Sequence, residues 1–521
     1  MFSLIQTSQT SILILLSTIT ILLVHKIHGW RTTARRKESI AIVVLGDIAR
    51  SPRIIRHALS FADQQWYVSI FAYTASKPPK ALLQHPNIKL VNLAEFPDRI
   101  VSRLPRIFFV LVIGPAKALY LSANLMWALL LKANQSSYIM VQNPPAIPTL
   151  PIVQLVRLMI GSKLVIDWHN TAYSILALKF GTERHPMVRL AKWTEATFGK
   201  HATLHLFVTQ AEKQSLSEMW NLQGIKKVFY DRPTKSFCRL TVSEIHSFFR
   251  RSSFNCDSIL QEMFIEGSLH NETLLTYEDD EDEKRVKMKK SRPALIVSST
   301  SWTMDEDFSL LIDALSLYAQ RTKPSSHPRK LPKVLCLITG KGPLRDEYLR
   351  IIERRSREEG WKASGIVCQS VWFDDPDDYR MLLGAADLGI SLHQSSSGFD
   401  LPMKVVDMFG CRLPVCARNF SSISELVKHG QNGLVFDSAT ELSEQLEELL
   451  RGLNSTDEEE PKTDAYTLRS LQDGIENTVY GPPNLPDDQA QLGSHDPSRS
   501  SWSCWEDHWN QHVLQTILQT L

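Results

Sequence analysis

The sequence lacks the cysteine patterns that build metal sites or disulfide frameworks. Its seven cysteines are odd in number and scattered, mostly within apolar runs, and no CxxC pair has a partner. We therefore interpret them as reduced thiols, with neither a metal site nor a disulfide frame. They are Cys238, Cys256, Cys336, Cys368, Cys411, Cys416 and Cys504.

Other absences narrow the class of function. No dense basic stripe is interleaved with aromatic residues, so we expect no nucleic-acid partner. The net charge of +2 carries no information about partners, because 58 basic and 56 acidic residues nearly cancel. The GxGxxG fingerprint of dinucleotide-binding proteins is missing. No acidic run lies at a position where a DxD motif would indicate a metal site. We therefore predict no metal ligands.

The first residues lack charge altogether. No charged side chain occurs from residue 1 to 24, and residues 12–24 are almost wholly apolar. Cations follow this run instead of preceding it, which is the reverse of a cleaved signal peptide, the alternative interpretation. With its flanks the run can span about 30 Å of hydrocarbon. Residues 1–30 therefore predict a single transmembrane helix, and the cationic flank places the rest of the chain in the cytosol.

A second apolar stretch covers residues 107–131. Gly114, Pro115 and Lys117 interrupt it, which argues against a second full membrane span. Two interpretations remain open: one or two helices buried against a sheet, or an amphipathic surface that dips into the bilayer near a lipid substrate.

The length of 521 residues predicts two or more domains. Strands rich in Val and Ile alternate with helical patterns, which predicts an α/β fold with parallel sheets. We expect an anchor (1–30), a Rossmann-like domain (38–240), a charged insert or linker (241–292), a second Rossmann-like domain (293–452), a disordered segment (453–500) and a C-terminal helix (501–521). The expected strands are residues 40–45, 67–72, 88–92, 138–142, 164–167, 204–209, 294–298, 334–339, 366–369, 388–392 and 414–417. The expected helices include residues 52–63, 307–319, 344–355, 377–385, 401–409 and 423–428.

The loop after the first strand is suited to an anion. Gly46 permits a tight turn, Ser51 is a good N-cap and Pro52 fits the first helical turn. Arg50 and Arg53 flank this helix N-terminus, so the loop is expected to hold a diphosphate.

Three side chains in the first domain are candidates for acid–base chemistry. Asp47 follows the first strand, where it either deprotonates an attacking hydroxyl or hydrogen-bonds its own turn. Asp167 and His169 close a later strand and point the same way, so either can act as a base or orient a sugar. A satisfied carboxylate and a packed histidine are the structural alternative.

The second domain offers a nucleotide site. Lys404 and Asp407 lie three apart near the start of a helix, where a cation suits a diphosphate and a carboxylate accepts ribose hydroxyls. A surface ion pair is the alternative. Ser299 and Thr300 follow one strand and offer hydroxyls, and the loop of Gly340, Lys341 and Gly342 follows another and offers close backbone approach and a cation for phosphate. A common Gly-x-Gly-Pro turn is the alternative for that loop. His393 ends the apolar run before the helix, and Gly398 lies in the turn that follows it.

Together these motifs resemble the chitobiosyldiphosphodolichol β-mannosyltransferase family. Residues 46–53, 141–145, 167–170, 339–343 and 397–410 carry the resemblance, which runs from about residue 39 to 452 and includes the anchor. The last two motifs are shared widely among GT-B glycosyltransferases, whereas residues 46–53 are far more specific.

The resemblance implies a GT-B fold, with two Rossmann-like domains facing across a cleft, at the cytosolic face of the endoplasmic reticulum membrane. It implies inverting transfer of the first mannose from GDP-mannose to dolichyl-diphosphate-linked GlcNAc2 in a β1,4 linkage, an early step of lipid-linked oligosaccharide synthesis for N-glycosylation. No tightly bound cofactor is implied, and Mg²⁺ would act only as a counterion to GDP. The implied partners are the dolichyl acceptor, membrane lipid and other mannosyltransferases of the pathway.

Inversion needs a base for the acceptor hydroxyl and stabilisation of the departing GDP. Position assigns the base to Asp47, with Asp167 and His169 as rivals. The acceptor diphosphate is assigned to Gly46, Arg50, Ser51 and Arg53. The donor is assigned to Ser299, Thr300, Gly340, Lys341, Gly342, His393, Gly398, Lys404 and Asp407.

The chain departs from the wider superfamily at one point. Asp400 and Asp407 are seven apart, where many relatives have two glutamates eight apart, and the loop after Val297 carries no cation. The role of Asp400 therefore stays open, and Asp305 and Asp307 are expected only to cap a helix. Two alternative functions remain: a GT-B transferase with another nucleotide sugar or acceptor, and an inactive membrane-tethered scaffold.

Overall fold

The computed structural model describes residues 36–96, 113–133, 135–251, 257–267, 269–279, 285–322, 331–395, 398–451, 453, 466–477 and 504–520. The chain divides into two compact units, one formed by residues up to Phe229 together with Trp509–Leu521, the other by Tyr230–His508. Within the described part of the chain, no helix is long and apolar enough to cross a membrane. The predicted anchor at residues 1–30 lies outside it.

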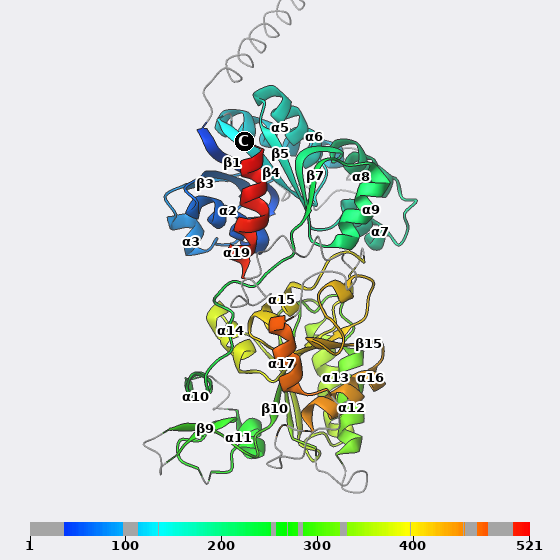
Figure 1. The fold of residues 1–521 in the computed structure, drawn as a ribbon. Helices are drawn as coiled ribbons and strands as arrows, with labels where there is room; N and C mark the ends of the chain where they lie inside the picture. The colour runs from blue at the N-terminus through cyan, green and yellow to red at the C-terminus, as the bar shows by residue number, and fades with distance from the viewer. Residues whose placement is uncertain are drawn as a thin grey trace, which may run out of the picture. The chain divides into compact units, whose positions relative to one another are not determined.

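The first unit is built on a seven-stranded sheet in the order β3-β2-β1-β4-β5-β6-β7 (Figure 1). Every strand pair in it is parallel. The strands are β1 (Arg36–Asp47), β2 (Tyr67–Tyr73), β3 (Ile88–Asn92), β4 (Ser136–Asn143), β5 (Lys163–Trp168), β6 (His201–Phe207) and β7 (Gln223–Val228). The helices are α2 (Pro52–Asp63), α3 (Lys80–Gln84), α5 (Gly114–Lys132), α6 (Thr149–Ile160), α7 (Ala172–Phe180), α8 (Pro186–Phe198) and α9 (Gln210–Trp220).

Local sequence explains why helix α2 begins where it does. Pro52 occupies its first turn, where its missing N–H costs nothing. Ile54, Ala58 and Phe61 recur at helical spacing and are fully buried against the sheet. The boundaries agree with the helix predicted at residues 52–63.

The C-terminal segment completes the core of the first unit. Helix α19 (Trp505–Trp509) continues through a π-helical turn (Asn510–Leu514) into α20 (Gln515–Gln519). The ring of Trp509 packs edge-on against Phe61 at 4.7 Å between centroids. The hydroxyl of Tyr138 donates to the backbone oxygen of Ile517 at 3.1 Å. Residues near the end of the chain thus pack in the same core as residues between 40 and 140.

The second unit has a six-stranded sheet in the order β12-β11-β10-β13-β14-β15, again with parallel pairs. Its strands are β10 (Ala294–Ser299), β11 (Val334–Thr339), β12 (Ile366–Val371), β13 (Leu388–Ser391), β14 (Val415–Arg418) and β15 (Gly433–Phe436). Its helices are α10 (Val242–Arg251), α11 (Ser258–Phe264), α12 (Ser309–Arg321), α13 (Arg345–Glu358), α14 (Pro376–Ala385), α15 (Met403–Gly410), α16 (Ala439–Leu450) and α17 (Leu468–Asn477).

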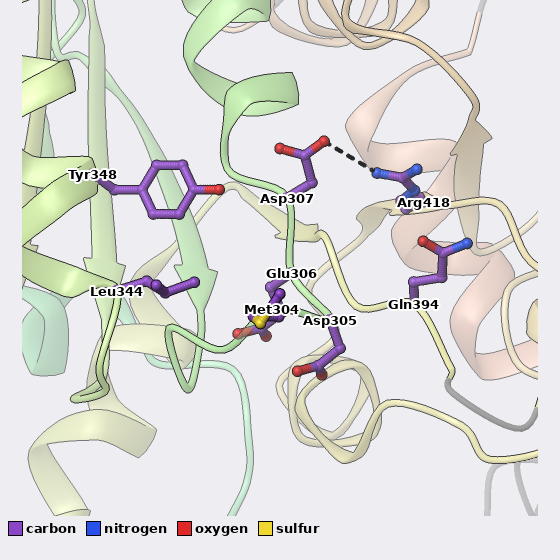
Figure 2. A pocket seen from close by; sticks show the side chains of 8 residues that line it. All are labelled: Met304, Asp305, Glu306, Asp307, Leu344, Tyr348, Gln394 and Arg418. Atoms are coloured by element: carbon purple, nitrogen blue, oxygen red, sulfur yellow. Dashed lines mark ion pairs between the residues drawn. The ribbon is translucent and has the colours of Figure 1, made fainter. Parts of the chain in front are cut away.

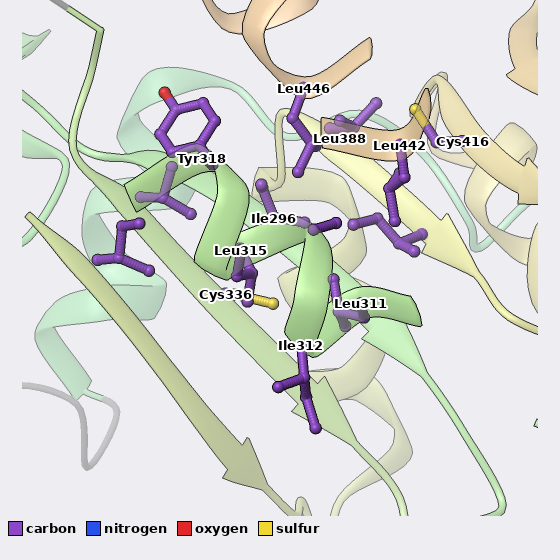
Figure 3. Close-up of a cluster of buried hydrophobic side chains, with 14 of the residues drawn as sticks. Ile296, Leu311, Ile312, Leu315, Tyr318, Cys336, Leu388, Cys416, Leu442 and Leu446 are labelled. Atoms are coloured by element: carbon purple, nitrogen blue, oxygen red, sulfur yellow. The ribbon is translucent and has the colours of Figure 1, made fainter. Parts of the chain in front are cut away.

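Figure 3 shows the core of the second unit, where α12 packs against the sheet. Leu311 and Leu315 of this helix meet Ile296 of β10 and Cys336 of β11 in one buried cluster. Leu442, from α16, belongs to the same cluster. The strands are apolar on both faces, as expected of a parallel sheet covered by helices.

Several elements differ from expectation. Residues 241–292, expected to be a charged insert or linker, contain α10, α11 and an antiparallel hairpin of β8 (Thr276–Glu278) and β9 (Val286–Met288). The helix expected at residues 423–428 is a 3-10 turn of three residues.

The disorder predicted for residues 453–500 is wrong for α17. Leu471 and Ile475 of this helix are buried. These two apolar side chains lie one helical turn apart, so the helix buries both of them although the rest of the segment is polar. Strands β7 and β15 were not predicted, because their sequences are short or rich in lysine.

Candidate active site

Asp47 ends β1 and organises the loop that follows it. One of its carboxylate oxygens accepts from the backbone N–H of Ala49 at 3.3 Å, and the other accepts from that of Ser76 at 3.1 Å. These hydrogen bonds, those from Ser76 first, hold the pKa of Asp47 below its ordinary value. Asp47 is thus held ionised by its own turn and by the loop after β2, which fits a structural role better than its expected role as a base.

The predicted anion loop is only partly available to a ligand. The side chain of Arg50 is 83% exposed and lies 3.8 Å from Asp47. Ser51 occupies the N-cap position of α2, but its hydroxyl donates to the backbone oxygen of Asp47. Gly46 is half-buried at the end of β1. Of the two arginines expected at the acceptor diphosphate, Arg50 is the exposed one.

Arg53 lies inside the unit. It is 3% exposed, and its guanidinium donates from Nε and Nη2 to the two carboxylate oxygens of Asp167, each at 3.0 Å. This fork geometry is the strongest form of a charge-assisted hydrogen bond. Arg53 therefore holds Asp167, whereas the sequence placed it at the acceptor diphosphate.

Asp167 orients His169. Asp167 is fully buried, and its Oδ2 lies 2.7 Å from Nε2 of His169, whose side chain is 22% exposed. Burial alone raises the pKa of Asp167, but Arg53 and then His169 hold it well below its ordinary value. An ionised Asp167 accepts a hydrogen bond from Nε2–H of His169, which leaves Nδ1 as the nitrogen with a free lone pair. Asp167 and His169 thus form a carboxylate–imidazole pair in which only the imidazole reaches the surface.

A second histidine completes the surroundings of Asp167. His57 is fully buried, and its Nε2 lies 3.5 Å from Oδ2 of Asp167. Its Nδ1 accepts a 2.9 Å hydrogen bond from the indole N–H of Trp509. Because an indole can only donate, the His57 proton is placed on Nε2, toward Asp167. Burial lowers the pKa of His57, so the ring is neutral.

Glu195 organises the backbone that follows His169. This buried carboxylate accepts from Nδ2 of Asn143 at 2.7 Å and from the backbone N–H groups of Ala172 and Tyr173 at the start of α7. Burial raises the pKa of Glu195 to about 7. Asn143 also donates to the backbone oxygen of Asn170, next to His169. The network connects β4, β5 and α8 around the loop that carries the imidazole.

In the second unit, Lys404 at the start of α15 pairs with Glu306. Its Nζ lies 2.6 Å from Oε1 of Glu306, which is only 2% exposed, and 3.4 Å from the hydroxyl of Ser301. The other carboxylate oxygen of Glu306 accepts from Thr300 and from the backbone N–H of Ser301. Lys404 thus stands beside the loop that follows β10.

The loop after β11 touches the same region. Gly340 has a φ of +132°, and a side chain there would collide with the backbone oxygen of Thr300. Gly342 approaches the backbone of Ser301 as closely. These glycines therefore allow two loops to lie against each other at the carboxyl edge of the sheet. Between them, Nζ of Lys341 lies 4.0 Å above the exposed ring of Trp372.

The remaining predicted donor residues surround α15. His393 lies between Asp305 at 3.4 Å and Asp400 at 3.3 Å. Although burial opposes it, these two carboxylates raise the pKa of His393 to about 9. Asp400 therefore holds a protonated histidine.

Gly398 and Asp407 are the last two predicted donor residues, the first before helix α15 and the second within it. The backbone oxygen of Gly398 accepts from the hydroxyl of Ser421 at 2.7 Å. Asp407 contributes to raising the pKa of Tyr379, after burial, and the hydroxyl of Tyr379 donates to Ser299 at 3.1 Å. Tyr379, which the sequence did not single out, thus hydrogen-bonds to Ser299 and is affected by the charge of Asp407.

A cavity of about 370 Å³ adjoins the loop that carries Glu306. Figure 2 shows Tyr348 and Leu344 on one side of this loop and Arg418 on the other. Asp307 faces Arg418 at 3.8 Å and accepts from the backbone N–H of Ser309 near the start of α12. Three consecutive carboxylates at residues 305–307 therefore have three different basic partners, and Asp307 is the one that caps a helix.

The structure adds no metal site within the described ranges, where no cluster of His, Cys, Asp and Glu is arranged to hold an ion. Six of the seven cysteines are free thiols, and Cys256 falls outside those ranges. The side chains in these two regions that sequence reasoning did not single out are His57, Glu195, Glu306, Tyr379 and Trp509. Only Glu306 had a local signal, because it stands between two aspartates that were considered as helix caps.

Comparison with known proteins places this geometry in a class. Residues 293–452 match the family model described as Glycosyl transferases group 1. The crystal structure of Anabaena HepE in complex with UDP and glucose superposes with a TM-score of 0.52 at 16% identity, covering 84% of this chain and 94% of that one. The fold is therefore that of a GT-B-like glycosyltransferase with parallel sheets.

Two relatives show which family of glycosyltransferases the chain resembles. Chitobiosyldiphosphodolichol beta-mannosyltransferase of Homo sapiens is 41% identical over 519 residues, which are 98% of this chain and 99% of the relative. UDP-glycosyltransferase TURAN of Arabidopsis thaliana is 40% identical over 427 residues, 79% of this chain and 88% of the relative. The chain belongs to the chitobiosyldiphosphodolichol beta-mannosyltransferase family and is a glycosyltransferase.

Proposed function

We propose that the enzyme transfers mannose from GDP-mannose to dolichyl-diphosphate-linked GlcNAc2, forming a β1,4 bond with inversion. The observation that carries the donor half is the position of Lys404, whose amino group stands beside the loops after β10 and β11. A cation at the start of a helix stabilises the diphosphate of a departing nucleotide. The names of the relatives support the dolichyl-linked acceptor and the β-mannosyl product of this proposal.

We further propose that His169 is the general base. Of the three candidates, Asp47 has one oxygen engaged by its own turn and the other by Ser76 in the loop after β2, and Asp167 is fully buried. His169 is partly exposed and is oriented by a carboxylate, which is the arrangement of an activated base. Nδ1 of His169 would take the proton of the acceptor hydroxyl while the sugar carbon is attacked, and GDP would leave with the electron pair of the broken bond.

Arg50 is the residue we assign to the acceptor diphosphate. It is the exposed cation of the loop after β1, and the helix α2 that follows adds its N-terminal dipole. We place the active protein at the endoplasmic reticulum membrane with its body in the cytosol, where residues 1–30 would anchor it. Membrane lipid and other mannosyltransferases of the pathway are the partners we propose.

A UDP-sugar is the second candidate donor, because the Arabidopsis relative is named a UDP-glycosyltransferase. The full-length protein in detergent should be supplied with a short-chain diphosphochitobiose lipid and, in parallel, with GDP-mannose, UDP-glucose or UDP-N-acetylglucosamine. Product formation with GDP-mannose alone supports the proposal. Product formation only with a UDP-sugar would overturn the donor assignment, and binding of donors without any transfer would favour the scaffold.

A further inference from the structure

His393 connects several loops of the second unit. It follows strand β13, and its backbone forms an isolated antiparallel bridge with Glu306 in the loop after β10. The next residue, Gln394, donates its backbone N–H to the backbone oxygen of Asp305 at 3.0 Å (Figure 2). The ring of Phe420, from the loop after β14, packs edge-on against the imidazole at 6.0 Å between centroids. Loops that follow three different strands therefore meet at this histidine.

Both ring nitrogens of His393 face carboxylates. Nδ1 lies 3.4 Å from Oδ2 of Asp305, and Nε2 lies 3.3 Å from Oδ2 of Asp400, just before helix α15. A neutral imidazole has one N–H and can donate to only one of these carboxylates, whereas an imidazolium donates to both. Although burial lowers it, the two carboxylates raise the pKa of His393 to about 9. The ring is therefore charged near neutral pH.

The charge of His393 is shared by carboxylates from two loops. The hydrogen bond from His393 holds the pKa of Asp305 below its ordinary value. Burial raises the pKa of Asp400, but His393 and then Ser395 keep it below its ordinary value. Neighbouring charged side chains of these loops pair with one another instead, Glu306 with Lys404 and Asp307 with Arg418. His393 is thus the counterion that Asp305 and Asp400 have in common.

The two segments that His393 holds together are those that place Lys404. Glu306, the partner of Lys404, is the residue next to Asp305. Asp400 lies one helical turn's length before Lys404, which stands in the first turn of α15. A shift of either segment would therefore move the amino group of Lys404 relative to the proposed donor diphosphate.

We propose that His393 is a positioning residue for the donor site, whose imidazolium holds the loop after β10 against the start of α15 so that Lys404 reaches the donor diphosphate. Asp400 is then the second partner of His393, which gives this aspartate a role. Without the charge, Asp305 and Asp400 would lose their common counterion and the two segments would separate. This rests on the proposed function in one respect, because the donor diphosphate is assigned to Lys404.

Hydrogen exchange of the ligand-free, full-length protein tests the arrangement without any donor. His393→Gln keeps a hydrogen-bonding side chain but removes the charge. We expect about tenfold faster amide exchange in peptides that cover residues 300–306 and 398–406, because exchange reports local opening. His429→Gln, at an exposed histidine of the same unit, is the matched control and should leave these peptides unchanged. Exchange in His393→Gln equal to that of the natural protein would overturn the proposal.

Calorimetric binding of GDP tests the consequence for the donor site. His393→Gln should weaken GDP affinity about tenfold, with kcat at saturating donor changed less than about threefold. His393→Lys keeps a cation between the two carboxylates and should regain most of the affinity. A folded His393→Lys variant that binds GDP as weakly as His393→Gln would overturn the proposal. If His393→Gln does not fold, Asp400→Asn replaces it and should weaken binding about threefold; unchanged affinity there would also overturn the proposal.

The pH profile separates charge from packing. The charged ring is present below its pKa, so GDP affinity of the natural protein should fall as pH rises through about 9. His393→Lys should keep its affinity up to about pH 10, since a lysine stays protonated there. Identical profiles would overturn the proposal. If the natural protein binds UDP instead of GDP, the donor assignment fails while the same comparisons proceed with UDP. If it binds neither, hydrogen exchange still decides the role of His393.

Discussion

The indole N–H of Trp509 donates a 2.9 Å hydrogen bond to Nδ1 of His57, a residue 452 positions earlier in the chain. His57 in turn directs Nε2 toward Asp167, which orients His169. The C-terminal helix therefore determines the tautomer of a buried histidine next to the proposed base. In this arrangement Trp509 and His57 are positioning residues, since neither reaches the surface.

Trp509→Phe is expected to lower kcat and to move the acid limb of the rate profile to higher pH. Without the indole donor the neutral ring of His57 loses its stabilising partner, so its pKa rises and a positive charge forms beside Asp167 on acidification. Leaving Nδ1 unpaired should also cost about 1–2 kcal/mol of unfolding free energy. Trp66→Phe is the control, because its ring packs on Phe61 and Tyr138. A purely structural role for Trp509 would lower Tm in both variants and leave both pH profiles unchanged.

His169→Gln should lower kcat about 100-fold or more, the usual contribution of a general base. Binding of GDP-mannose, measured by calorimetry, should be unchanged because the proposed donor residues are in the second unit. Asp47→Asn is the matched comparison and should cost much less, since that carboxylate supports its own turn and the loop after β2. The base assignment is wrong if Asp47→Asn abolishes transfer while His169→Gln retains it.

Lys404→Met should weaken donor affinity about tenfold and lower the unfolding free energy by about 2 kcal/mol, because Glu306 is left buried without its cation. Lys404→Met combined with Glu306→Gln separates the two effects. The double variant should regain stability, since no charge is left unpaired, but its KM for the donor should stay high. Recovery of normal donor KM in the double variant would show that Lys404 is only a structural partner of Glu306.

Glu195→Gln should become more stable relative to the natural protein as pH rises from 5 to 8. The pKa of Glu195 is about 7 in the fold against 4.5 for the free side chain, so the folded state binds more protons in this window. Its contribution to the unfolding free energy is therefore present below pH 4.5 and lost as pH rises through 7, by at most about 3 kcal/mol. Thermal melts of both proteins across this range measure the difference. Glu218→Gln, at an exposed position, should show no such dependence, and an equal trend in both variants would contradict the buried-carboxylate explanation.

The strand–helix alternation could be predicted because it depends on local apolar spacing. Helix α2 and strand β11 have the predicted boundaries. Helix α17 could not be found this way, because two buried side chains stabilise it within a polar composition. Strand β7 could not be predicted either, because its lysines are untypical of a buried strand and its pairing with β6 stabilises it.

The same distinction between local sequence and tertiary structure applies to the candidate site. The sequence by itself determined that Asp47, Asp167 and Lys404 stand near the ends of strands or the start of a helix, since alternation places loops at the carboxyl edge of a parallel sheet. Only the tertiary structure decided their partners. Arg53 meets Asp167 across 114 residues and Lys404 meets Glu306 across 98. An ion pair depends on which loops the sheet order brings together, and that order is a property of the whole fold.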